Sequence, residues 1–110
     1  MDNEYDSKEM ILRPEWALLT IKQLQKDAAL CGIELTDSTI PSVYEAWITY
    51  ILQELTTIEK KSPELLHSFL YRIDLPEKDF MQNPFPSKNL AESVFKRTFM
   101  KVWLKEKYKQ

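Results

Sequence analysis

Two residue types that perform much of enzyme chemistry occur only once each in this sequence. His67 is the sole histidine, a common general base and metal ligand, and Cys31 is the sole cysteine, a nucleophile when its pKa is lowered. One histidine and one cysteine complete a zinc site only if carboxylates join them. The usual nucleophile–base pairs and glycine-rich phosphate loops are also missing. We therefore predict no catalytic residue, no metal site and no cofactor.

Helical periodicity indicates where these two side chains lie. In a helix over residues 63–73, His67 points away from the apolar stripe, so we expect it to be exposed. Cys31 continues the apolar face of a helix over residues 14–31, which is a common place for a small buried cysteine. We expect both residues to be structural rather than catalytic.

Carboxylates are numerous, and a buried pair among them would offer another route to acid–base chemistry. The pattern places no such pair inside an apolar stripe. Glu54 comes nearest, because it lies at the edge of a stripe, close to Trp47. We expect Glu54 to form a structural ion pair with Arg72 or with a lysine of the last helix. An enzyme with a carboxylate site is the hypothesis that we rank last.

The end of the chain is strongly basic. Residues 96–110 contain six basic residues and one acidic residue, whereas residues 1–95 contain nine basic and sixteen acidic residues. Arg97, Lys101 and Lys105 step by four and form one helical ridge, with about 6 Å of helix rise between successive positions. Such a ridge can follow a phosphate backbone, so these three residues are the candidate nucleic-acid-binding surface.

The same charges have a structural explanation, which we favour. The ridge flanks the apolar face of its helix, and long basic side chains cover apolar surface while their head groups stay in water. Cations near a helix C-terminus also oppose the negative end of the helix dipole. The acidic remainder of the chain repels a polyanion, and it can attract the basic segment within the fold. Nucleic-acid binding is therefore the alternative hypothesis.

These side chains must be positioned by helices, because Gly32 is the sole glycine and apolar residues recur at helical spacing. We predict an all-α bundle with an irregular, proline-containing stretch at 74–87 and four main helices at about 14–31, 43–60, 63–73 and 88–108. Gly32 is the expected stop of the first helix. The expected helix starts are Pro14, a capping box of Ser42 and Glu45, Ser62, and Ser87.

The length of 110 residues suits one domain. We predict a mobile acidic arm over residues 1–12, whose apolar end at 10–12 can dock on a helical domain over residues 13–110. The acidic start is unlike a signal peptide, and no apolar run approaches the roughly 20 residues of a membrane helix. A single cysteine fits a reducing compartment. We therefore expect a cytoplasmic protein without membrane contact.

Some apolar residues exceed what a four-helix core needs. They are Trp16, Leu19 and Leu30 in the first helix, and Phe80 and Phe85 in the irregular stretch. Either they bury against each other and against residues 10–12, or they form a partner-binding surface, where large apolar side chains are common. The second reading predicts a small non-enzymatic module that acts through protein–protein contact, with a homodimer as its simplest form.

Overall fold

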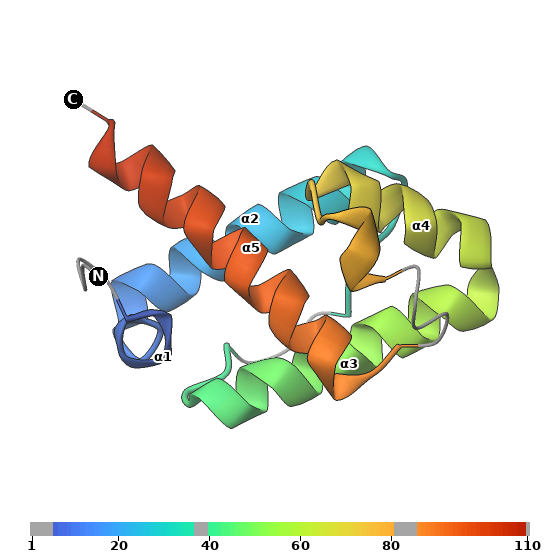
Figure 1. Ribbon diagram of the computed structural model, residues 1–110. Helices are drawn as coiled ribbons and strands as arrows, with labels where there is room; N and C mark the ends of the chain where they lie inside the picture. The colour runs from blue at the N-terminus through green and yellow to red at the C-terminus, as the bar shows by residue number, and fades with distance from the viewer. Residues whose placement is uncertain (1–5, 37–39, 81–85, 110) are drawn as a thin grey trace.

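The computed structural model describes residues 6–36, 40–80 and 86–109, and the regular secondary structure found there is helical (Figure 1). The expected all-α bundle is confirmed, and each of the four main helices lies within one residue of its expected bounds. The elements are α1 (Ser7–Met10), α2 (Pro14–Leu30), α3 (Tyr44–Lys61), α4 (Pro63–Arg72), the 3₁₀ turn η1 (Glu77–Asp79) and α5 (Lys88–Lys107).

Two of the three expected serine caps are present. The Leu65 amide donates to Ser62 Oγ at the start of α4, and the Leu90 amide donates to Ser87 Oγ at the start of α5, each at 3.2 Å. The expected capping box at the start of α3 is wrong. That helix begins one residue later than the pattern requires, so its N-cap is Val43, which has no side-chain oxygen to offer.

Helices α2 and α4 end in the same way, although only α2 ends at a glycine. Gly32 has φ 77°, and the amide of Ile33 donates to the carbonyl of Ala28 at 2.9 Å. At the end of α4, Asp74 takes the same left-handed conformation with φ 68°. The expected stop at Gly32 is therefore confirmed, and Asp74 has an equivalent role in α4.

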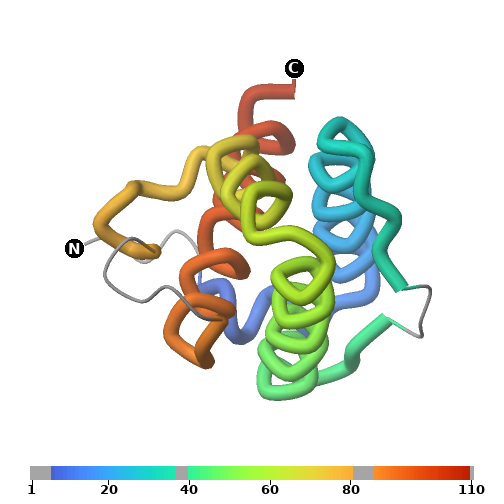
Figure 2. Tube along the Cα trace, turned by 90° about the vertical axis from the view of Figure 1, so that its right-hand side faces the viewer, coloured from blue at the N-terminus to red at the C-terminus, as the bar shows by residue number. Residues whose placement is uncertain are grey.

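Helix α3 contacts both α4 and α5, while α2 packs against α5 and α4 (Figures 1 and 2). The link between α3 and α4 is only Ser62, so α4 turns back across α3, as the short connection predicts. The apolar face of α5 belongs to the core, because Phe95 and Phe99 are fully buried. Trp47 of α3 packs against Phe95, with 5.9 Å between ring centroids.

The expected mobile arm over residues 1–12 is described only from Asp6 onward. There, Ser7–Met10 form α1 and Ile11 is completely buried in the core. Lys8 Nζ also lies 4.9 Å from the centre of the Tyr44 ring on α3. Residues 7–11 of the expected arm therefore contact the folded body, through buried Ile11 and through Lys8.

Candidate functional site

The expected basic ridge of Arg97, Lys101 and Lys105 lies on α5, and each head group contacts another part of the same chain. The Arg97 guanidinium contacts the end of α4. It donates to Asp74 Oδ2 at 3.0 Å through Nη2 and to the Ile73 carbonyl at 3.3 Å through Nε. The Asp74 side chain is 80% exposed, so water screens this ion pair, which contributes about 1 kcal/mol or less.

Lys101 and Lys105 bind a buried polar pair on α2. Lys101 Nζ lies 2.9 Å from Asp27 Oδ2, and Lys105 Nζ donates to Gln23 Oε1 at 2.8 Å. Gln23 Nε2 in turn donates to Asp27 Oδ2 at 3.2 Å, and Asp27 is only 2% exposed. These four side chains form one network that holds α2 and α5 together. We call it the Asp27 network.

Asp27 is the residue that the sequence analysis missed. It lies on the buried face of α2, three residues after Leu24 and next to Ala28, so a carboxylate within an apolar stripe was the available signal. A buried carboxylate requires a cation or several hydrogen-bond donors. The basic C-terminal segment supplies that cation here, which makes the uneven charge of the chain partly an internal attraction.

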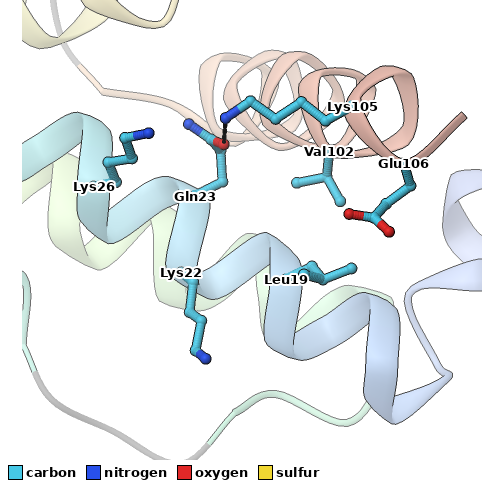
Figure 3. A pocket seen from close by; sticks show the side chains of 7 residues that line it. All are labelled: Leu19, Lys22, Gln23, Lys26, Val102, Lys105 and Glu106. Carbon is cyan, nitrogen blue, oxygen red and sulfur yellow. Dashed lines mark hydrogen bonds between the residues drawn. The ribbon is translucent and has the colours of Figure 1, made fainter. Parts of the chain in front are cut away.

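Beside the Asp27 network, a shallow hollow of about 200 Å³ lies between α2 and α5 (Figure 3). Leu19 and Val102 provide its apolar lining. Val102 points from α5 toward α2, and Leu19 lies below Glu106 (Figure 3). The polar residues around it are Lys22, Gln23, Lys26, Lys105 and Glu106.

A second hollow of about 270 Å³ adjoins the first, because Glu106 lines both. Its apolar walls are the indoles of Trp16 on α2 and Trp103 on α5. Trp16 is half-buried and packs on Phe99, with 5.7 Å between ring centroids. Lys107 Nζ lies 4.8 Å from the centre of the Trp103 ring. We call the two hollows together the α2–α5 groove.

The five apolar residues of the expected partner surface do not form one site. Trp16 and Leu19 line the α2–α5 groove. Leu30 is 57% exposed, but it follows Leu19 by eleven residues, about 16 Å along the helix, and lines neither hollow. Phe80 is 2% exposed and belongs to the core, so we remove it from the expected surface. Phe85 lies outside the described residues.

His67 and Cys31 lie close to their expected positions. His67 is exposed, and its ring centroid lies 5.8 Å from that of Phe80. Cys31 is half-buried rather than fully buried, and its Sγ lies 3.7 Å from the carbonyl oxygen of Ser68. Burial raises the pKa of the Cys31 thiol, which reduces the thiolate fraction that a nucleophile requires.

Glu54 has a different partner from the one expected. The side chain is buried, and its Oε1 accepts a hydrogen bond of 3.0 Å from the Thr36 amide. Tyr50, one turn earlier on α3, donates from its hydroxyl to the Thr36 carbonyl at 3.3 Å. Glu54 therefore anchors the segment that follows α2, and the expected pair with Arg72 or a lysine is corrected to this backbone contact.

Across residues 6–36, 40–80 and 86–109, no three side chains of His, Cys, Asp or Glu lie close enough together to hold a metal ion. In the same ranges, no helix has both the length and the apolar character required to cross a bilayer.

Comparisons with protein-family models, with curated proteins and with solved structures found no match to this chain.

Proposed function

We propose that this protein is a small non-enzymatic helical module that acts through contact with another protein, and that the α2–α5 groove is its contact surface. The observation that supports the proposal is the position of Trp16, Leu19 and Trp103, which line one groove and are each half-buried. Tryptophan contributes disproportionately to binding energy at protein interfaces. A cytoplasmic location accords with the single, half-buried cysteine.

The contacts of the basic ridge favour this proposal over nucleic-acid binding. Lys101 binds a buried carboxylate, and Arg97 binds Asp74 and a backbone carbonyl, so neither head group is available for a phosphate without losing a contact within the fold. Lys105 is likewise bound to Gln23. Nucleic-acid binding therefore remains the alternative. It would require these side chains to give up contacts within the fold, which the sequence did not indicate.

The test compares Leu19→Asp with Leu18→Asp. Both are leucines of α2, but Leu18 is 42% exposed and lines neither hollow of the groove, so it is a matched control. Tagged wild type and both variants are purified from their native cells, and co-purifying proteins are quantified by mass spectrometry. Size-exclusion chromatography with light scattering measures self-association in parallel.

We expect Leu19→Asp to abolish the main specific contact, whether with a second copy or with another protein, and Leu18→Asp to retain it. Circular dichroism must show that both variants remain folded. A chain that is monomeric at every concentration and whose co-purifying proteins are the same for wild type and Leu19→Asp would contradict the proposal.

A further inference from the structure

We infer that the α2–α5 groove binds an acidic amphipathic helix of a partner protein. The inference rests on the proposed function and adds the chemistry of the partner. It starts from the charge of the groove: among the described residues that line it, four are lysines and Glu106 is the single carboxylate. The lysines are Lys22, Lys26, Lys105 and Lys107.

Lys22 and Lys26 are the cations that a partner can reach most readily. Both are exposed, and they lie one turn apart on the outer face of α2. Within the part of the chain that the structure describes, neither forms an ion pair with a carboxylate. Figure 3 shows the Lys22 side chain extending away from α5, whereas that of Lys26 points to the side of α2 on which α5 lies. Carboxylates along one edge of a bound helix would complement this pair of lysines.

The apolar part of the groove suits a helix rather than a flat surface. From Leu19 to Lys26, the first hollow follows α2 for seven residues, about 10 Å along its axis. Its apolar part at Leu19 begins three residues after Trp16 of the second hollow, about 4.5 Å along α2, which matches anchors at i and i+3 or i+4 of a bound helix. Leu19 and Val102 can receive one anchor, and the two indoles can receive another.

The lysines also argue against two other occupants of the groove, a second copy of this chain and a nucleic acid. In a symmetric dimer formed through this groove, the same patch of each copy faces the other, so the lysine-rich rims approach each other. Nucleic acid supplies negative charge but no apolar ridge to cover Leu19 and Val102. An acidic amphipathic helix offers apolar side chains to Leu19 and Val102 and carboxylates to the lysines around them.

The experiment uses a fluorescein-labelled designed peptide of 18 residues. Leucines at i, i+3, i+4 and i+7 form its apolar face, and glutamates flank that face. A second peptide replaces the glutamates with lysines, and a third scrambles the acidic sequence. Fluorescence anisotropy measures the Kd of each peptide with the full chain at two salt concentrations.

The protein variants separate the floor from the rim. Leu19→Asp places a charge in the apolar floor of the groove, and Lys22→Glu/Lys26→Glu reverses the charge of two lysines on its rim. Leu18→Asp is the apolar control, and Lys60→Glu/Lys61→Glu, at the exposed end of α3, is the charge control. Circular dichroism and thermal unfolding check that all four variants are folded.

We expect the acidic peptide to bind at least about tenfold more tightly than the lysine peptide and the scrambled peptide, with weaker binding at high salt. Leu19→Asp and Lys22→Glu/Lys26→Glu should each weaken it about tenfold or more, while both controls bind like wild type.

Absence of binding by the acidic peptide, or equal binding of the lysine peptide, would overturn the inference. So would dimerisation that Leu19→Asp abolishes, or tight binding of a duplex oligonucleotide that competes with the peptide. If the peptide fails while Leu19→Asp still removes a co-purifying protein, the proposed function stands and only the chemistry of the partner is wrong.

Discussion

Asp27 is the buried charged side chain that links α2 to α5 through the Asp27 network. At 2% exposure it has lost nearly all contact with water, and Lys101 and Gln23 replace the lost hydration. A buried ion pair adds little net stability compared with apolar residues of the same shape, but removal of one partner leaves the other uncompensated. The pair therefore specifies how the two helices fit more than it adds to their total stability.

Removal of the Lys101 charge should destabilise the protein. Lys101→Met keeps most of the aliphatic side chain but leaves Asp27 without its cation, and we expect a loss of about 2–3 kcal/mol in the free energy of unfolding. Urea denaturation measures this loss. Lys96→Met is the control, because Lys96 is an exposed lysine of the same helix, and its effect should stay within about 0.5 kcal/mol. A double variant, Asp27→Leu/Lys101→Met, should recover part of the loss. Equal stability of Lys101→Met and wild type would show that the pair is dispensable.

Tyr44 is the second residue whose environment changes its chemistry. Its hydroxyl donates to Glu92 Oε2 at 3.3 Å, and its ring meets that of Phe95 edge-on at 5.3 Å. Burial, reinforced by the Glu92 carboxylate, raises the pKa of Tyr44 to about 12. The folded state therefore holds this proton more tightly than the unfolded state does, where the pKa is about 10.

The stability that Tyr44 contributes in this way is present below about pH 10 and is lost as the pH rises to about 12. We expect the free energy of unfolding of wild type to fall more steeply over this window than that of Tyr44→Phe. Ultraviolet difference titration should show a tyrosine ionisation near pH 12 that Tyr44→Phe removes, and Glu92→Gln should lower that pKa. Tyr108→Phe, at a residue that is 74% exposed, should leave this late transition unchanged. A wild-type titration without it would contradict the assignment.

At the scale of the elements, helix ends depend on backbone conformation as much as on side-chain caps. Both α2 and α4 require one residue with positive φ after their last turn, and only glycine adopts that conformation without strain. Gly32 meets the requirement in α2. Asp74 meets it in α4, where its carboxylate also pairs with Arg97. At the end of α4, the aspartate therefore introduces some backbone strain but also forms an exposed ion pair.

Opposite substitutions at the two ends should have opposite effects. Gly32→Ala should cost about 1 kcal/mol of unfolding free energy, and the cost is conformational because the added carbon has no heavy atom within 4 Å apart from those of residues 31–33. Asp74→Gly should be neutral or stabilising by up to about 1 kcal/mol, since the relief of strain offsets a weak surface pair. Thermal and urea unfolding measure both. A large loss for Asp74→Gly would instead show that the Arg97 contact is important.

At the scale of the whole molecule, residues 73–80, which follow α4, add to the core of the bundle. Phe80 follows the turn η1 and packs against the rings of His67 and Tyr71 on α4, with centroid distances of 5.8 Å and 5.4 Å. Tyr71 is also hydrogen-bonded to Glu77 at the start of the turn. This short segment therefore contributes to the core although it contains little regular structure.

Truncation of Phe80 should have the effect of a core substitution. Phe80→Ala should lower the free energy of unfolding by about 3–5 kcal/mol, because it removes a buried ring and leaves a cavity. Leu104→Ala, at a residue that is 40% exposed, should change stability by about 0.5 kcal/mol or less. Chemical denaturation compares the two. If Phe80→Ala is as stable as wild type, the ring is not part of the core in solution.

The sequence alone determined the helices of this protein, because periodicity, caps and turns are local properties of the chain. The repeat of apolar residues located all four main helices, and Ser62, Ser87 and Gly32 marked three of their ends. Phe95 and Phe99 follow the same repeat in the last helix, and both are fully buried.

Only the tertiary structure decided which polar groups meet. Asp27 and Lys101 are 74 residues apart in the chain, and no spacing rule connects two helices that cross. Glu54 binds the Thr36 amide for a similar reason, since the position of a loop against a helix depends on packing. The α2–α5 groove likewise depends on packing, because residues of two helices that are distant in the sequence line it together. The helical periodicity of apolar residues indicates which face of each helix is buried, but the contacts between faces follow from how the helices pack.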